Sequence, residues 1–421
     1  MEIIAEFGST LLIVACVLGF FMAWGIGSND VANAMGTSVG AKALTLTGAI
    51  LVACIFEFAG AYLAGGEVTE TIRKGIIDPS LLASTPHYLV YGMLSSLLAA
   101  GIWLLVASIF GWPVSTTHAI VGAIVGFSAV CIGTESVNWG KVGSIMSSWI
   151  VSPVLAGTIA FGIFKSVQSL ILDGPDQFAR AKKFIPGYIF VVGFIICMVT
   201  LLKGLKHLGI ELSAPQSVGM AIAFGAFLAG IGRFLLSRVK EKGTDARQGK
   251  LSDLERVFAV LMVFTACAMA FAHGSNDVAN AVGPLAAVVN VIQSGGQVMA
   301  QSALPGWVLL VGAFGIVLGL VMLGYRVIET VGRNITELTP SRGFAAELAA
   351  ATTVVVASGA SLPVSTTHTL VGAVLGVGLA RGIGAIDVRV VGKIVLSWIV
   401  TLPAGASLSI LFFYTFKGIF G

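Results

Sequence analysis

Long stretches without any charged side chain divide the sequence into apolar segments. Residues 7–29, 142–164 and 257–276 contain no Asp, Glu, Lys or Arg, and the stretch 79–134 is longer still. A helix that crosses a membrane needs about 20 predominantly apolar residues. The pattern therefore predicts an all-α polytopic membrane protein with about 12 transmembrane segments. We expect these segments near residues 9–35, 44–64, 88–110, 113–131, 143–165, 185–203, 215–236, 255–281, 306–325, 344–361, 364–380 and 388–416.

The composition excludes a soluble enzyme. The 421 residues are 57% hydrophobic and 10% charged, whereas soluble domains have about 25% charged residues. The net charge of +4 does not indicate a nucleic-acid partner, because Lys and Arg are spread over the loops. The environment that the composition predicts is the lipid bilayer.

Loop charges predict the orientation of the chain in that bilayer. Lys and Arg concentrate in the loops that follow odd-numbered segments, and such loops usually face the cytoplasm. We therefore expect both termini on the extracytoplasmic side. Short loops and the lack of a targeting peptide favour the plasma (cell inner) membrane of a prokaryote, in a multi-pass arrangement, with a eukaryotic plasma membrane as the alternative.

Two motifs occur twice, in the same order. GSNDVANAMG at 27–36 returns as GSNDVANAVG at 274–283, and PVSTTH at 113–118 returns at 363–368. Seven predicted segments precede the second GSNDVANA, and an odd number of crossings inverts the second copy. We expect two inverted-topology repeats with broken helices or re-entrant hairpins, an architecture typical of secondary transporters. The predicted division is a first repeat (1–165), two connecting transmembrane helices (166–236), a short polar cytoplasmic linker (237–254) and a second repeat (255–421).

The GSNDVANA motifs carry acids inside apolar runs. Asp30 and Asp277 each interrupt such a run, at a cost of about 2.5–3.5 kcal/mol for an Asp at a helix centre. Neither motif contains Lys or Arg, so a mobile cation or a proton is the expected partner. Carboxylate and amide oxygens form a hard ligand set that suits Na⁺, and nearby glycines are expected to let the helix unwind and offer carbonyl oxygens. The predicted sodium ligands are Asp30, Asn33, Asp277 and Asn280.

The PVSTTH motifs read as helix beginnings with capping hydroxyl groups. At membrane depth, hydroxyls and the free N–H groups of a helix N-terminus form a site for an oxyanion. An ordinary capped turn is the alternative. An anion beside two carboxylates is stable only when a cation neutralises them, which couples the two ions. The residues predicted to bind the anion are Ser115, Thr116, Thr117, Ser365, Thr366, Thr367, Asn29 and Asn276.

Further polar residues lie near these motifs. Glu57 lies inside a predicted span without an acidic counterpart in the second repeat, and we assign it to coupling or gating, with a structural role as the alternative. His118 and His368 end the PVSTTH motifs and are assigned to coupling or gating, although a structural role is equally compatible. The evidence for a functional role of His273 is weaker, because this histidine occurs in only one of the two copies. Glu347 is expected at the membrane interface or in gating.

These motifs resemble those of the PiT-type inorganic phosphate transporters. GSNDVANA and PVSTTH each occur twice, FEFAG surrounds Glu57, and ETIRKGII occupies 70–77. The resemblance implies a phosphate symporter that uses Na⁺ or H⁺, without an organic cofactor. The functional residues that it implies are Asp30, Asp277, Asn29, Asn33, Asn276, Asn280, Ser115, Thr116, Thr117, Ser365, Thr366, Thr367 and Glu57. We predict Na⁺-coupled phosphate symport by alternating access. Proton coupling, sulfate as the cargo, and an anion channel or sensor are the alternatives, and a homodimer is one assembly that the sequence leaves open.

No enzymatic motif competes with this interpretation. The sequence contains no HExxH, no P-loop and no Cys/His metal cluster. We therefore predict a transporter that is not an enzyme.

Overall fold

The computed structural model describes residues 2–202, 209, 212–242, 251–298, 304–334, 339–382 and 388–421. Within these ranges the secondary structure is helical, apart from one isolated bridge between Ile77 and Val137. The main helices of the first half and of the connection are α1 (Glu2–Gly40), α2 (Leu46–Ala64), α3 (Gly66–Lys74), α4 (Pro86–Ile109), α5 (Thr116–Phe127), α6 (Trp139–Val167), α7 (Gln177–Leu202) and α8 (Ala214–Arg238). Those that follow are α9 (Asp253–Gln293), α10 (Gly306–Met322), α11 (Gly324–Asn334), α12 (Pro340–Gly359), α13 (Thr366–Arg381) and α14 (Val388–Phe420).

Each of the predicted apolar segments overlaps one of these helices, except that 306–325 extends from α10 into the start of α11. In the described ranges, eight helices are long and apolar enough to cross a membrane. Two shorter apolar helices, Thr116–Ile132 and Gly306–Met322, accompany them. The all-helical fold is therefore confirmed, whereas the number of 12 crossings and the inversion of the repeats stay predictions.

The helix contacts of the two halves match. In the first half α1 packs on α4, and in the second α9 packs on α12. The halves also interlock, because α10 packs on α1 while α2 packs on α9. Likewise α13 packs on α6, and α14 packs on α5. The parts of α1 and α9 that carry the GSNDVANA motifs are therefore buried among the other helices.

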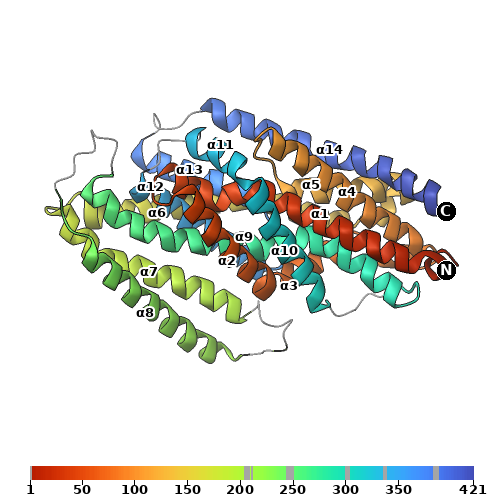
Figure 1. Ribbon diagram of the computed structural model, residues 1–421, viewed down its shortest axis with the longest axis horizontal. Coiled ribbons are helices and arrows are strands. Elements are labelled where there is room, and N and C mark those ends of the chain that lie inside the picture. Colours follow the sequence, from red (N-terminus) through yellow and green to blue (C-terminus); the bar gives the residue numbers. More distant parts are fainter. Residues whose placement is uncertain are drawn as a thin grey trace.

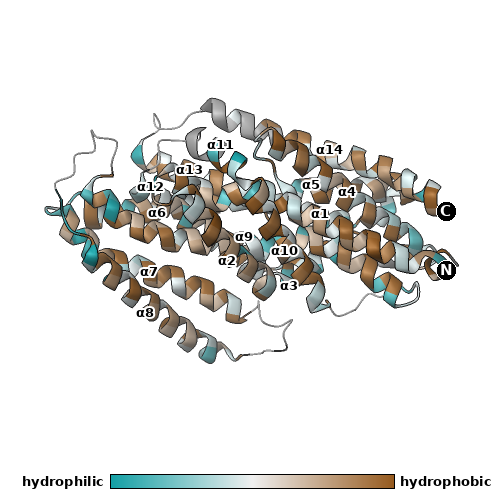
Figure 2. Ribbon diagram, viewed as in Figure 1, coloured by the Kyte–Doolittle hydropathy of each residue, from teal (hydrophilic) through white to brown (hydrophobic). Residues whose placement is uncertain are grey.

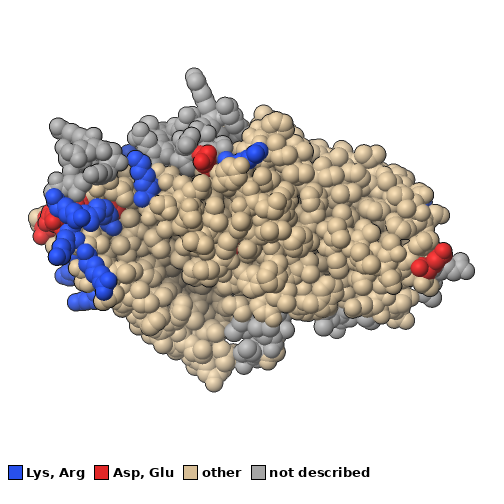
Figure 3. Space-filling view, viewed as in Figure 1, with Lys and Arg blue, Asp and Glu red and all other residues tan. Residues whose placement is uncertain are grey.

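Hydrophobic and charged residues separate along the long axis of the molecule. Hydrophobic residues cover most of the length of the helices, and hydrophilic residues concentrate at their ends and connections (Figure 2). Both termini lie at one end (Figure 1), and on the face shown in Figure 3 many Lys and Arg side chains gather at the opposite end, where α6 and α8 end and α7 begins. The middle of the predicted linker, 243–250, lies outside the described residues.

Candidate functional site

Two helical hairpins carry the PVSTTH motifs. The first joins α4 to α5 and the second joins α12 to α13. The helix starts predicted from the sequence are confirmed: the Ser115 Oγ accepts the backbone N–H of His118 at 3.3 Å, and the Ser365 Oγ accepts that of His368 at the same distance. Both serines are buried. Each hairpin therefore presents a capped helix N-terminus inside the protein.

The first asparagine of each GSNDVANA motif holds a hairpin against its long helix. The Asn29 Nδ2 donates to the carbonyl oxygen of Trp112 at 2.9 Å, and the Asn29 Oδ1 accepts the N–H of Val114 at 3.2 Å. Asn276 makes the same pair of bonds with Leu362 and Val364, each at 3.2 Å. In this structure both ends of each amide engage hairpin backbone. A phosphate-binding role for these two residues stays a prediction.

Each motif aspartate lies beside a threonine of its own hairpin. The Thr116 hydroxyl donates to the Asp30 Oδ2 at 2.6 Å, and the Thr366 hydroxyl donates to the Asp277 Oδ2 at 2.8 Å. The two carboxylates are at most 1% exposed. Their second oxygens, Oδ1, accept no hydrogen bond from any described residue. Both carboxylates therefore keep capacity to bind a further donor or a cation.

The second asparagine of each motif reaches across to the other half. The Asn33 Nδ2 donates to the Thr367 hydroxyl at 2.8 Å, and the Asn280 Nδ2 donates to the Thr117 hydroxyl at 3.3 Å. These two threonines in turn donate to the opposite hairpin: Thr117 to the carbonyl oxygen of Val364, and Thr367 to that of Val114. The structure therefore brings the predicted cation and anion residues of both halves into one buried cluster.

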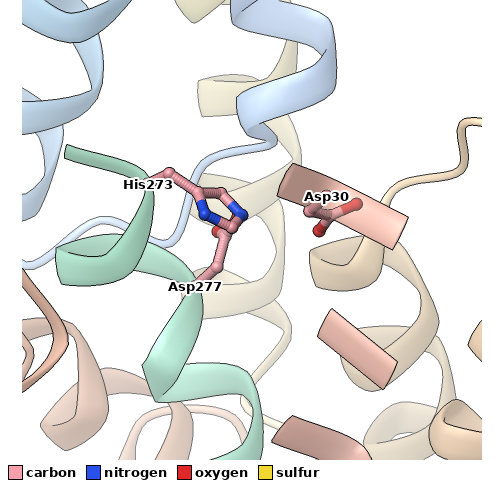
Figure 4. Close-up of side chains that lie close together, drawn as sticks. All are labelled: Asp30, His273 and Asp277. Carbon is pink, nitrogen blue, oxygen red and sulfur yellow. The ribbon is translucent and has the colours of Figure 1, made fainter. Parts of the chain in front are cut away.

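His273 and Glu57 make this cluster asymmetric. The His273 Nε2 lies 2.9 Å from the Asp277 Oδ2, and its Nδ1 lies 3.2 Å from the Glu57 Oε1. Figure 4 shows the imidazole directly beside the Asp277 carboxylate, with Asp30 approaching from α1. All three side chains of this contact chain are completely buried. Sequence reasoning gave little weight to His273, although its position four residues before Asp277 places both on one face of α9.

The corresponding positions in the other half are apolar. Ile26 precedes Asn29 as His273 precedes Asn276. Gly27 approaches the backbone of Ile316 as Gly274 approaches that of Glu57, so Ile316 is the counterpart of Glu57. The places that His273 and Glu57 occupy in one half are therefore occupied by Ile26 and Ile316 in the other.

The motif glycines act differently from what the sequence predicts. The sequence predicts that they let the helix unwind, but α1 and α9 continue through both motifs. A Cβ atom added to Gly27 would lie 1.9 Å from the Ile316 carbonyl oxygen, and one added to Gly274 would lie 2.2 Å from that of Glu57. These glycines are needed because only a residue without a side chain permits such close helix packing. The expectation of unwound motifs is wrong in this structure.

Three further residues named from the sequence are buried as well. Glu347 accepts hydrogen bonds from three hydroxyl groups, those of Thr37 (2.5 Å), Ser38 (2.6 Å) and Thr265 (2.7 Å). It lies within the protein between α1, α9 and α12. The rings of His118 and His368 contact each other, with their centroids 4.4 Å apart. Their assignment to coupling or gating stays a prediction.

Electrostatics favours a cation in the cluster. Carboxylate oxygens of Asp30 and Asp277 lie within 4.8 Å of each other. Two unit charges at that distance repel each other by about 3.5 kcal/mol at an effective dielectric constant of about 20. A small cation between them converts this repulsion into attraction. The binding of an oxyanion at the hairpin hydroxyl groups and helix N-termini stays a prediction.

Comparison with known proteins supports a transporter. The model of the phosphate transporter family matches residues 26–409. A protein described as a phosphate permease in Haemophilus influenzae is 52% identical over 423 residues, covering 100% of both chains. Inorganic phosphate transporter 2-1 of Arabidopsis thaliana is 44% identical and is matched over 96% of this chain and 72% of its own length. A solved structure described as the sodium-dependent phosphate transporter has a TM-score of 0.90 at 41% identity, covering 97% of this chain and 100% of its own.

These matches confirm two predictions from the sequence. The resemblance to PiT-type transporters is confirmed, and so is the prediction that the chain is not an enzyme. The apolar helices and the matched family together make it a multi-pass membrane protein.

Proposed function

Because this chain belongs to the phosphate transporter family, we propose that it carries inorganic phosphate across the membrane together with Na⁺, by alternating access. One observation carries the proposal. In both halves a hairpin threonine donates to a buried motif aspartate, at 2.6 and 2.8 Å, and the hairpins meet at the same cluster.

The cation occupies the carboxylate side of the cluster. Asp30 and Asp277 supply the charge, and Asn33 and Asn280 supply amide groups next to them. The Oδ1 atoms of Asp30, Asp277 and Asn280 accept no hydrogen bond from any described residue, so each has a lone pair to offer. An all-oxygen set of this kind suits a hard monovalent ion. The sodium dependence named for the similar solved structure supports the same choice.

Phosphate occupies the hairpin side of the cluster. Hydroxyl groups of Thr116, Thr117, Thr366 and Thr367 lie there, next to the N-termini of α5 and α13. These groups bear no net charge, so they bind an anion without a permanent ion pair. In this structure they donate to the two aspartates and to the carbonyl oxygens of Val114 and Val364, and in this proposal they turn to the anion when it binds. Phosphate beside two bare carboxylates is repelled. Its binding therefore requires the cation, which makes the two movements obligatorily coupled.

The basic end of the molecule faces the cytoplasm in this proposal. Lys and Arg side chains gather there, at the end opposite to the two termini (Figure 3). The excess of Lys and Arg in cytoplasmic loops predicts this orientation. The termini are then extracytoplasmic, and the membrane is the plasma (cell inner) membrane.

Uptake of radiolabelled phosphate into proteoliposomes tests the function. We expect an inward Na⁺ gradient to drive accumulation, and choline in place of Na⁺ to abolish it. Uptake driven equally well by a pH gradient without Na⁺ would reject sodium coupling. Competition by sulfate at equal concentration would reject phosphate selectivity, and a lack of counterflow exchange would indicate a channel.

A matched pair of variants tests the hairpin assignment. Thr116→Val removes the hydroxyl group that contacts Asp30 with little change in shape. Thr158→Val is the control, because Thr158 lies exposed on α6 and its hydroxyl bonds only its own helix. We expect uptake to fall in the first variant and to stay normal in the second.

A further inference from the structure

We infer that Asp30, His273 and Asp277 together form a binding site for a divalent transition-metal ion, with Zn²⁺ as the best-matched ion. One ligating atom of each of these residues lies within 4.8 Å of the other two. This inference concerns a second class of cation. It depends only on the positions of these three side chains, and it does not require that phosphate uptake depends on Na⁺.

The spacing of the ligating atoms fits a single metal ion. Zinc binds imidazole nitrogen and carboxylate oxygen at about 2.0–2.2 Å, which puts two ligands of one tetrahedral ion about 3.3 Å apart. The His273 Nε2 and the Asp277 Oδ2 are 2.9 Å apart, and every pair in the cluster is within 4.8 Å. Small side-chain rotations therefore bring all three atoms onto one ion.

The imidazole decides which class of ion the cluster prefers. Na⁺, Mg²⁺ and Ca²⁺ take oxygen ligands, whereas Zn²⁺, Co²⁺ and Cu²⁺ bind imidazole nitrogen well. Ile26 lies four residues before Asp30, at the position that His273 occupies before Asp277. The nitrogen ligand is thus a feature of one half, and a site built only from the duplicated motifs would not contain it.

Glu57 supplies the support that a metal-binding histidine usually has. Its Oε1 lies 3.2 Å from the His273 Nδ1, and the Asp277 Oδ2 lies 2.9 Å from the His273 Nε2, so the imidazole has a carboxylate next to each of its nitrogens. Metal-ligating histidines commonly donate their other N–H to a carboxylate in this way, which fixes the ring and makes it more basic. The counterparts of Glu57 and His273 in the other half are both apolar, so the histidine and its supporting carboxylate are found in the same half of the site.

The carboxylates have lone pairs left for a metal. The Oδ1 atoms of Asp30 and Asp277 accept no hydrogen bond from any described residue, and both side chains are at most 1% exposed. A buried carboxylate oxygen normally has a donor or a cation next to it. This observation is independent of the imidazole and points to the same ligand.

Metal binding to the purified full-length chain tests the inference. The protein carries no polyhistidine tag, is stripped with a chelator, and is titrated calorimetrically with Zn²⁺, Co²⁺ or Mg²⁺ in phosphate-free buffer. We expect Zn²⁺ to bind more tightly than Co²⁺, and Mg²⁺ to bind most weakly. His273→Ile copies the other half, and we expect it to weaken Zn²⁺ binding by about 100-fold, and Glu57→Gln by about 10-fold. His87→Gln removes a histidine at the start of α4 and should change nothing.

Two results would overturn the inference. One is Zn²⁺ affinity in His273→Ile equal to that of the wild type, and the other is equal affinity of the wild type for Zn²⁺ and Mg²⁺. If His273→Ile does not fold, the electron paramagnetic resonance spectrum of the Cu²⁺-loaded wild type decides the question. Coupling to an imidazole nitrogen supports the site, and its absence rejects it. Because no transport is measured, failure here is distinguishable from failure of phosphate uptake.

Discussion

Replacing Asp30 by Asn removes one of the two buried negative charges with almost no change in shape. The Asn side chain keeps an oxygen for the Thr116 hydroxyl group, which lies 2.6 Å from the Asp30 Oδ2. The fold should therefore persist, and the change isolates the charge. We expect Asp30→Asn to weaken the Na⁺ dependence of phosphate uptake.

The expected size follows from Coulomb's law for a cation next to a carboxylate. A cation about 4 Å from a carboxylate is attracted by about 4 kcal/mol at an effective dielectric constant of about 20. Since about 1.4 kcal/mol corresponds to a tenfold change, loss of the charge alone weakens Na⁺ binding by up to about 1000-fold. The amide oxygen still coordinates the ion, so we expect the Na⁺ concentration for half-maximal uptake to rise between about 10-fold and 1000-fold.

Proteoliposome uptake measured across a Na⁺ series, with choline keeping the ionic strength constant, provides the assay. Asp173→Asn is the matched control, because Asp173 is exposed beyond the end of α6. Monodisperse behaviour on gel filtration shows that each variant is folded. Wild-type rates and wild-type Na⁺ dependence in folded Asp30→Asn would refute the electrostatic reasoning.

Three other predictions follow from the packing, the backbone and the charges. Gly274→Ala puts a Cβ 2.2 Å from a backbone oxygen of α2 and should abolish uptake, whereas Gly143→Ala meets no atom within 4 Å and should not; wild-type uptake in Gly274→Ala would contradict the packing. Ser361, at φ 57°, donates to a carboxylate oxygen of Glu67 at 3.1 Å. Ser361→Ala should therefore cost about 1 kcal/mol of stability. Ser361→Gly should regain a similar amount by relieving the left-handed strain; equal melting temperatures in the two variants would argue against the strain. A C-terminal epitope tag should be detected on intact cells, and detection only after permeabilisation would reverse the orientation.

The sequence by itself determined where the helices lie and which residues carry the chemistry. Apolar runs of about 20 residues can satisfy their backbone in lipid only as helices, so each predicted segment overlaps a helix of the structure. The motifs around Asp30 and Asp277 were visible because acids inside such runs are costly and because they occur twice. The capped helix starts at Ser115 and Ser365 were also predictable, since capping depends on local sequence.

Only the tertiary structure decided which of these residues meet. Helical periodicity tells which side chains share a face of one helix, but it does not tell which helix packs against that face. The bonds from Asn33 to Thr367 and from Asn280 to Thr117 join opposite halves, and no spacing in the sequence predicts them. The contact between His273 and Glu57 depends on a packing of α2 on α9 that Gly274 permits. The asymmetry of the site therefore arises from tertiary packing, because single residues without a repeated counterpart become informative only beside their neighbours in space.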